Sequence, residues 1–159
     1  MNADVEVMKF FPRTLEPQES DALVDEFQAE FEQSGFCPFV VGLRGEGSFL
    51  GFLGLHSVSA EMAFAPAVEV GWRLEQKAWG HGYATEAGAR ALRFGFDDLG
   101  LDEIVSFTAA VNVASRRVME RLAMVREPTD DFDHPGIPPG HRLGPHVLYR
   151  AKRGIPQRT

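Results

Sequence analysis

The sequence VEVGWRLEQKAWGHGYATEA, residues 68–87, combines a strand, a glycine-rich turn and the start of a helix. Residues 68–74 alternate strictly, as in a strand with two different faces. One face carries Val68, Val70, Trp72 and Leu74, and the other carries Glu69, Gly71 and Arg73. A glycine inside a strand, such as Gly71, indicates a bulge or the close approach of another group to the backbone.

Gly80 and Gly82 form the turn that opens the helix. Glycine lets the backbone turn tightly and approach a ligand without hindrance from a Cβ. The first amides of a helix have no acceptor within it, and the helix dipole adds positive potential, so the turn can cradle a phosphate or pyrophosphate. A purely structural turn explains two glycines equally well. The dinucleotide fingerprint is excluded because Thr85 stands at its third glycine, and the P-loop is excluded because no Gly-Lys-Ser/Thr triplet occurs.

Outward from this stretch, hydrophobic periodicity predicts an α/β protein, a mixed sheet with helices on its faces. Two apolar runs flank the turn signal of residues 44–48, which is typical of a hairpin. Residues 128–145 are rich in proline and glycine and are predicted to be a long loop. The predicted helices are 17–33, 83–98 and 114–122, and the predicted strands are 39–43, 49–55, 68–74, 103–111 and 146–152.

Length and composition indicate a single globular domain, residues 1–159, with 44% hydrophobic and 25% charged residues. The formal net charge of −7 resides in residues 1–35, which hold nine acidic and two basic side chains. No net basic field attracts nucleic acid, and no apolar run is long enough to span a membrane, so neither partner is expected. A single cysteine, Cys37, allows no intrachain disulfide, which favours a reducing, cytoplasmic location.

Together with NVASRRVMERLAM, residues 112–124, the opening stretch resembles the GNAT acyltransferase superfamily, specifically its RimJ/RimL-like branch. In that branch the strand reads approximately E-x-G-W-x-L, the turn W-G-x-G-Y-A-T-E-A and the later segment N-x-x-S-x-x-V-M-E-x-L-G-M. The resemblance runs from about Phe39 to Arg150. It implies the GNAT fold, with a mostly antiparallel mixed sheet and helices on both faces, and an N-acetyltransferase that uses acetyl-CoA on a primary amine.

The resemblance also implies the cofactor contacts. Gly82 and Ala84 match the small residues of the superfamily turn, whereas Trp79 stands where many members have Gln or Arg. The amides of Gly80 to Thr85 are expected to hold the CoA pyrophosphate. The backbone of Leu74 is expected to pair with pantetheine and to stabilise the oxyanion formed from the thioester. The residues expected at the cofactor are Trp72, Leu74, Trp79, Gly80, His81, Gly82, Tyr83, Ala84, Thr85, Asn112, Ser115 and Arg117.

Two side chains are the catalytic candidates. Asn112 resembles a family asparagine that contacts pantetheine or positions the acid, and Met119 replaces the tyrosine acid of many members. Ser115 is therefore expected to protonate the departing thiolate, and its structural alternative is a helix cap. Glu69 is expected to act as the base on the amine or to bind it as a cation, and its structural alternative is a salt bridge with an arginine across the strands.

The loop of residues 128–145 and the residue after it contain three histidines that invite a metal interpretation. His134, His141 and His146 lack helical or compact ligand spacing, so we expect no metal site. The loop is instead expected to line the acceptor pocket, as the corresponding segment does in the resembled family.

One departure from the resembled branch concerns the N-terminus. Its members begin with a strand and a helix before the stretch that is Met1 to Met8 here, so either the true start lies upstream or the first strand and most of the first helix are expected to be missing. The sheet would then have an uncovered edge, which a homodimer could protect. Cys37 lies far upstream of the motifs, so direct transfer without an acyl-enzyme is expected. Two alternative functions remain open: a non-catalytic CoA-binding regulatory module, and nucleotide binding by the glycine turn.

Overall fold

The computed structural model describes residues 1–45 and 47–154, and within them the chain forms three α-helices and seven strands. The helices are α1 (Pro17–Ser34), α2 (Tyr83–Asp97) and α3 (Val113–Arg121). The strands are β1 (Pro38–Gly42), β2 (Phe49–Ser57), β3 (Val68–Leu74), β4 (Glu103–Ala109), β5 (Val125–Arg126), β6 (Phe132–Asp133) and β7 (Pro145–Lys152). Two single-turn 3₁₀ helices, η1 (Gln76–Ala78) and η2 (Pro128–Asp130), lie in the connections.

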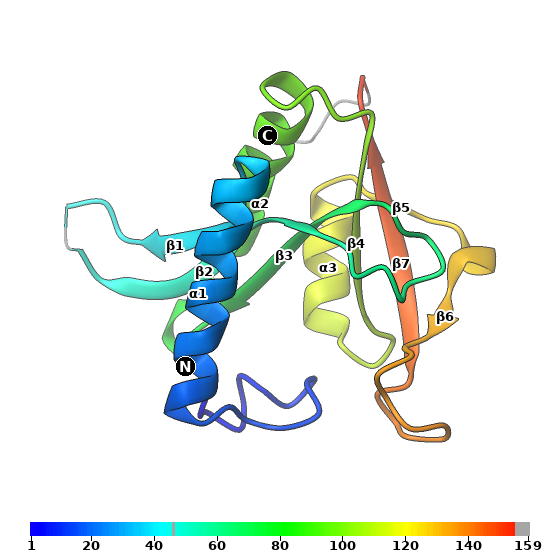
Figure 1. Cartoon of the computed structure of the whole chain (residues 1–159), viewed down its shortest axis with the longest axis horizontal. Coiled ribbons are helices and arrows are strands. Elements are labelled where there is room, and N and C mark those ends of the chain that lie inside the picture. Colours follow the sequence, from blue (N-terminus) through cyan, green and yellow to red (C-terminus); the bar gives the residue numbers. More distant parts are fainter. Residues whose placement is uncertain (46, 155–159) are drawn as a thin grey trace.

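One mixed sheet organises the fold, with the order β1-β2-β3-β4-β7-β5 and with β6 paired to β7 outside this path. Only β3 and β4 are parallel, and every other pair is antiparallel. Helix α1 covers one face near β1 and β2, while α2 and α3 lie on the opposite face (Figure 1). The α/β class, the mostly antiparallel sheet and the helices on both faces are therefore confirmed.

The segment 128–145 differs from the prediction. It was expected to be a loop, but it contains η2 and the two-residue strand β6, which pairs Phe132 with His146. A strand of two residues is too short to produce an alternating pattern, so periodicity alone does not reveal it.

Helix α1 begins and ends at residues suited to those positions. Pro17 occupies the first turn, and the Glu19 carboxylate accepts a hydrogen bond of 2.9 Å from the backbone N–H of the N-cap residue Glu16. Gly35 ends the helix in the left-handed conformation, with φ of 78°. Phe27 packs edge-on against Phe52 of β2 with ring centroids 5.2 Å apart, which fixes α1 on this face of the sheet.

The main core lies on the other face, between the sheet and the helices α2 and α3. Its most completely buried side chains come from the sheet, from α2 and from α3 with its C-cap, and include Val70, Leu92, Ile104, Met119 and Leu122. Burying side chains of this size contributes about 1.5–3 kcal/mol each, so this cluster anchors β3, β4, α2 and α3 against one another. The elements that surround the cavity described below are therefore held by the core.

Strand β1 forms an edge of the sheet, because among the described residues it pairs only with β2. Its side chains Phe39 and Val40 are 53% and 72% exposed. This agrees with the expected uncovered edge. That a second copy of the chain covers this edge in a homodimer stays a prediction.

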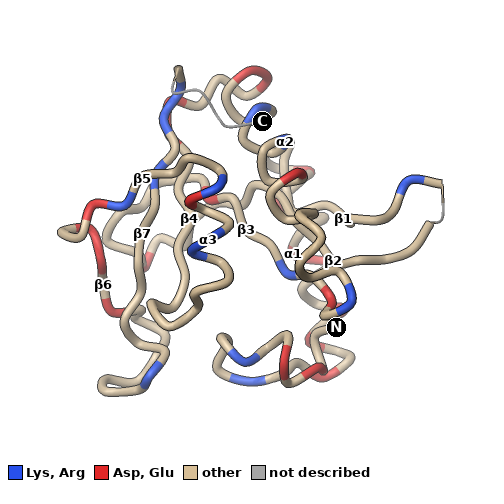
Figure 2. The backbone as a smooth tube through the Cα atoms, turned by 180° about the vertical axis from the view of Figure 1, so that it is seen from behind, with Lys and Arg blue, Asp and Glu red and all other residues tan. Residues whose placement is uncertain are grey.

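Charged residues follow no single face of the molecule. Figure 2 shows Lys and Arg spread over strands, helices and loops, and acidic residues on α1 and the N-terminal segment. Arg150 of β7 pairs with Glu103 at 2.5 Å and with Asp130 of η2 at 2.7 Å, which fastens the 128–145 segment to the sheet. None of the helices in the described part of the chain is long and apolar enough to cross a bilayer.

Candidate active site

A large cavity of about 830 Å³ opens where β3 and β4 separate. The two strands form a single parallel register pair, Glu69 with Val105, and diverge beyond it. The cavity is lined by β3, the turn before α2, the start of α3 and the N-terminal segment of residues 6–12. A parallel pair that opens in this way leaves backbone groups unpaired inside the sheet, where a ligand can use them.

Leu74 presents its backbone to this opening. The N–H of Glu75 donates to the Leu50 carbonyl at 2.8 Å, so Glu75 and Leu50 form a hydrogen-bonded pair. Hydrogen-bonded and non-hydrogen-bonded pairs alternate along antiparallel strands, so the neighbouring pair of Leu74 and Gly51 is not hydrogen-bonded. The N–H and C=O of Leu74 therefore point away from β2, toward the gap. The carbonyl accepts a hydrogen bond of 2.9 Å from Trp79 Nε1. The N–H of Leu74 is the donor that the opening leaves for a ligand.

The glycine turn has the geometry of an anion cradle. Gly80 and Gly82 adopt φ of 79° and 85°, which only glycine adopts without strain, and a Cβ at either position would meet no atom within 4 Å. Gly82 is the N-cap of α2 and no side chain caps the helix. Within the described residues, the amides of 80–84 donate no hydrogen bond. The amide of Thr85 donates to the Gly82 carbonyl at 2.9 Å, so the cradle ends one residue earlier than expected.

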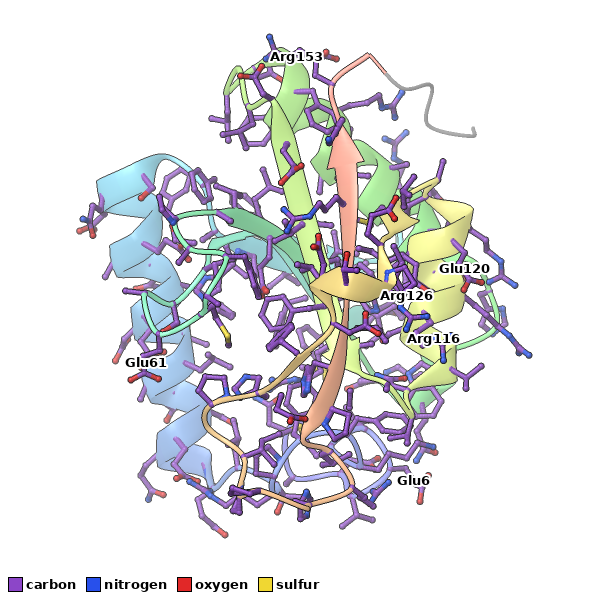
Figure 3. The ribbon with its side chains drawn as sticks, turned by 90° about the vertical axis from the view of Figure 1, so that its right-hand side faces the viewer. Glu6, Glu61, Arg116, Glu120, Arg126 and Arg153 are labelled. Carbon is purple, nitrogen blue, oxygen red and sulfur yellow. The ribbon has the colours of Figure 1, made fainter. Side chains whose placement is uncertain are left out.

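One of the expected cofactor residues, His81, is not placed at the cavity. The His81 ring stacks on Tyr83 with centroids 5.5 Å apart and does not line the cavity, whereas Tyr83 does. Arg117 lines the cavity as expected. Its neighbour Arg116, labelled on α3 in Figure 3, instead donates from Nη1 to the Ala110 carbonyl at 3.2 Å.

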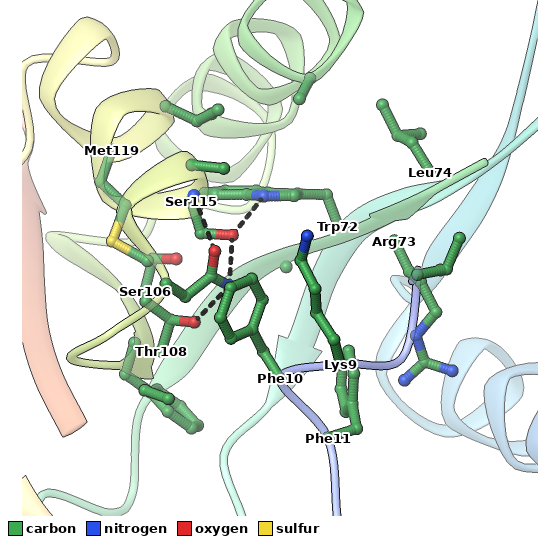
Figure 4. Close-up of a pocket in the computed structure, with 18 of the residues that line it drawn as sticks. Lys9, Phe10, Phe11, Trp72, Arg73, Leu74, Ser106, Thr108, Ser115 and Met119 are labelled. Atoms are coloured by element: carbon green, nitrogen blue, oxygen red, sulfur yellow. Dashed lines mark hydrogen bonds between the residues drawn. The ribbon is translucent and has the colours of Figure 1, made fainter. Parts of the chain in front are cut away.

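Ser115 lies at the centre of a hydrogen-bond network at the start of α3 (Figure 4). Its Oγ accepts from Trp72 Nε1 at 3.2 Å and from Asn112 Nδ2 at 3.1 Å. The Asn112 amide also donates to Thr108 Oγ1 at 3.0 Å and accepts from the Ser115 N–H at 3.3 Å. The helix cap is thus Asn112, so the structural alternative for Ser115, a cap of this helix, is not observed.

This network determines what the Ser115 hydroxyl can do. A serine hydroxyl has one donor and two acceptor lone pairs, and Trp72 and Asn112 occupy both lone pairs. The O–H is left to donate outward. The Asn112 side-chain amide makes three hydrogen bonds, one to Thr108 and two to Ser115. With these bonds Asn112 orients the serine.

Glu69 lines the cavity from the opposite face of β3. Its Cα is paired across the strands with that of His56, whose Nδ1 lies 2.5 Å from Glu30 of α1. Burial raises the pKa of Glu69 to about 7, an increase that the nearby His56 reduces and Glu30 reinforces. No arginine forms a salt bridge with Glu69 among the described residues, so that structural alternative is not observed. A carboxyl that is half ionised near neutral pH is suited to act as a base.

Sequence reasoning missed the N-terminal segment and Arg73. Lys9, Phe10 and Phe11 line the cavity, and Figure 4 shows the first two directed into it. The Lys9 ammonium lies 5.4 Å from the Trp79 ring centroid. Arg73 lies on the face of β3 opposite Trp72 and points toward this segment (Figure 4). The sequence feature that could have indicated Arg73 is the alternation of residues 68–74, which places Arg73 on the same face of the strand as Glu69.

The segment of residues 128–145 also reaches the cavity. His134 and His146 line it with ring centroids 4.9 Å apart, and His146 Nδ1 lies 3.0 Å from the Gly144 carbonyl. Burial lowers the pKa of both rings. In the described portion of the chain, no group of three or more His, Cys, Asp and Glu side chains could hold a metal ion.

The fold and this cavity define an α/β domain with a glycine turn at the start of α2 beside an opened parallel strand pair. Comparison with known families agrees, because the acetyltransferase (GNAT) domain matches residues 1–125. The chain belongs to the GNAT acetyltransferase family, whose members use acetyl-CoA.

Individual proteins support the same assignment. The FsC-acetyl coenzyme A-N(2)-transacetylase of Aspergillus fumigatus is 35% identical over 114 residues, which cover 68% of this chain and 47% of that protein. The chain therefore spans about half the length of this relative. The uncharacterised N-acetyltransferase YnaD of Bacillus subtilis is 29% identical over 92% of this chain and 81% of its own. A crystal structure of a GNAT acetyltransferase from Bacillus anthracis superposes with a TM-score of 0.76 at 27% identity, covering 95% of this chain and 84% of that one.

Proposed function

We propose that the protein transfers an acetyl group from acetyl-CoA directly to a primary amine, with Glu69 as base and Ser115 as acid. The observation that carries the proposal is that one cavity holds both groups on opposite sides of β3. Glu69 has a pKa of about 7, and Ser115 has a hydroxyl whose acceptor positions are already filled.

The chemistry assigns each group one task. An amine must lose a proton to become a nucleophile, and Glu69 accepts it. The amine nitrogen then attacks the thioester carbon, a C–N bond forms, and the carbonyl oxygen becomes an oxyanion to which the Leu74 N–H can donate. When the C–S bond breaks, the thiolate takes the proton of the Ser115 hydroxyl, which solvent restores. The nitrogen gives its second proton to solvent and becomes the neutral amide, and Glu69 releases its own proton to solvent before the next amine binds. The products are the acetylated amine and CoA.

The cradle before α2 fits the anionic part of acetyl-CoA. Five consecutive amides at the positive end of α2, those of residues 80–84, have no acceptor among the residues that the structure describes. Arg117 lines the same cavity and supplies a positive charge for a phosphate. Trp72 and Asn112 hold Ser115, so their contribution is to position the acid.

Direct transfer is favoured over an acyl-enzyme because Cys37 is poorly suited as a nucleophile. It is buried, it does not line the cavity, and burial with the nearby Glu30 raises the pKa of its thiol. The motifs of residues 68–87 and 112–124 support membership of the RimJ/RimL-like branch, and the single cysteine supports a cytoplasmic location. The exposed edge of β1 supports a homodimer.

A thermal-shift titration tests the proposal, with acetyl-CoA, CoA, ATP and NAD side by side. A ligand at 100 times its dissociation constant adds about 2.7 kcal/mol to the free energy of unfolding. We expect only the two CoA species to raise the melting temperature, and amines to release free thiol from acetyl-CoA. Stabilisation by ATP or NAD alone, or no thiol release with any amine, would contradict it.

A further inference from the structure

Arg73 is a cation with spare hydrogen-bond donors inside the acceptor side of the cavity. Its guanidinium carbon lies 4.2 Å from the Phe11 ring centroid and 5.1 Å from that of Phe52, so two aromatic rings pack against it. Nη1 donates to Asn2 Oδ1 at 2.9 Å. Nε is buried and has no hydrogen-bond partner among the described residues.

Arg73 has no carboxylate partner among the described residues, and unlike Arg116, whose Nε is likewise buried without a hydrogen-bond partner, it lines the cavity. Arg13, Arg126 and Arg150 each form an ion pair with Asp or Glu. Arg73 is largely withdrawn from solvent and forms none within residues 1–45 and 47–154, and burial lowers its pKa to about 10, which leaves it charged at neutral pH. A buried charge without a partner is costly, so the surroundings of Arg73 are suited to an anion that arrives with a ligand.

The gap between Arg73 and Glu69 has room for that ligand. Both side chains and Gly71 share one face of β3, and all three line the cavity. A Cβ at Gly71 would meet one atom within 4 Å among the described residues, Glu69 Oε1 at 3.5 Å. The Glu69 carboxylate therefore lies near Gly71, and beyond the two chain neighbours no other described atom lies within 4 Å of the position that a side chain on Gly71 would take. The Cα atoms of Glu69 and Arg73 are about 13 Å apart along a strand of this kind.

We infer that Arg73 binds a carboxylate of the acetyl acceptor, so that the acceptor is an amino carboxylate held by its amine at Glu69 and by its carboxylate at Arg73. This inference rests on the proposed function, because it assigns the substrate class of the same site. Guanidinium matches the planar, two-oxygen geometry of a carboxylate better than any other side chain. The rings of Phe11 and Phe52 keep water from the guanidinium and hold its plane.

The competing anion is a phosphate of CoA. Two observations place that phosphate elsewhere: the free amides lie at residues 80–84, and Arg73 lies on the face of β3 opposite Trp72. The test distinguishes the two sources by measuring CoA affinity separately from acceptor preference.

The experiment compares ω-amino acids of two to eight carbons with their primary amides, at saturating acetyl-CoA, by thiol release. The same amino acids and amides are also titrated into CoA-saturated protein. The preference for the carboxylate is then measured in binding affinity as well as in turnover. The variants are Arg73→Met, Arg73→Lys and the control Arg90→Met, an exposed arginine of α2. For at least one chain length we expect the wild type to favour the carboxylate at least tenfold in kcat/KM. Arg73→Met should reduce this ratio to about one, Arg73→Lys should retain part of it, and Arg90→Met all of it.

Three results would overturn the inference. The ratio could be the same in Arg73→Met and in the wild type, the wild type could show no preference at any length, or Arg73→Met could weaken CoA binding tenfold. Failure of the proposed function gives a different result, in which no amine releases thiol and CoA does not bind. Comparing each carboxylate with its amide in both proteins also cancels the difference between the amine pKa values of the two compounds.

Discussion

The two faces of β3 differ in how they meet the cavity. On the face toward α2 and α3, Trp72 donates to Ser115, and the Leu74 carbonyl accepts from Trp79, so the groups are neutral and each is fixed by a partner. On the face toward α1 and the N-terminal segment, the ionisable side chains Glu69 and Arg73 are withdrawn from water. Gly71 leaves a gap between them.

This difference shows how the two faces of one strand can serve two chemically different substrates, a thioester and an amine. The thioester side needs fixed neutral donors, because charge develops there only during the reaction. The amine side needs a group whose protonation changes near working pH, and burial supplies it. Substitutions on one face should therefore alter one half of the reaction and leave binding at the other half intact.

The largest effect is expected on the charged face. Glu69→Gln removes the base but keeps the shape of the side chain, so kcat/KM should fall about 10²- to 10³-fold while the dissociation constant of acetyl-CoA is unchanged. Thiol-release kinetics and calorimetry measure the two quantities. Glu61→Gln, at an exposed glutamate outside the cavity, is the control and should match the wild type. Retained activity in Glu69→Gln would break the division between the faces.

The neutral face should respond next. Ser115→Ala removes the hydroxyl that donates to the thiolate, and we expect a fall in kcat on the order of 10²-fold with little change in CoA affinity. Ser106→Ala is the matched control, since Ser106 is buried, lines the same cavity and forms no part of the Ser115 network. Equal effects of the two substitutions would show that the network is structural only.

The pH dependence sharpens the account of the charged face. Glu69 is a base only when ionised, so kcat/KM should rise with pH and level off above about 7, the pKa of Glu69. His56 holds that pKa down, so His56→Gln should move the midpoint to higher pH and lower the rate a few-fold at pH 7. A midpoint that stays in place in His56→Gln would mean that another group controls the profile.

The smallest effect is expected for the lone thiol. Cys37→Ala should retain full activity, because Cys37 does not line the cavity. Steady-state kinetics with and without a thiol-alkylating reagent measure this. Complete loss of activity in a folded Cys37→Ala protein would contradict direct transfer.

The neutral face was largely predictable from the sequence, and the reason is that its determinants are local. Alternation sets the faces of residues 68–74, the two glycines set the turn, and Asn112 and Ser115 belong to the same helix start. What was not predicted there was detail within a single turn: the cap is Asn112, and Thr85 uses its amide within the helix.

The charged face was only partly predictable because its determinants are distant in the sequence. Glu69 was expected on the strand, but its pKa is raised by burial and by Glu30 of α1, and His56 of β2 offsets part of that increase. Arg73 is held by Asn2, 71 residues earlier, and by Phe11. No periodicity in the N-terminal segment indicates that it folds back over the cavity.

A calorimetric titration of acetyl-CoA tests the division between the faces most directly. It compares Gly82→Ala, Glu69→Gln and the control Gly35→Ala, a glycine with a similar left-handed φ of 78° and open space around it, outside the cavity. Both alanines cost about 1–2 kcal/mol of backbone strain, so only their positions differ. We predict that Gly82→Ala weakens binding at least tenfold, whereas Glu69→Gln and Gly35→Ala bind as tightly as the wild type. Unchanged binding in Gly82→Ala, or equal weakening in Glu69→Gln, would contradict the account.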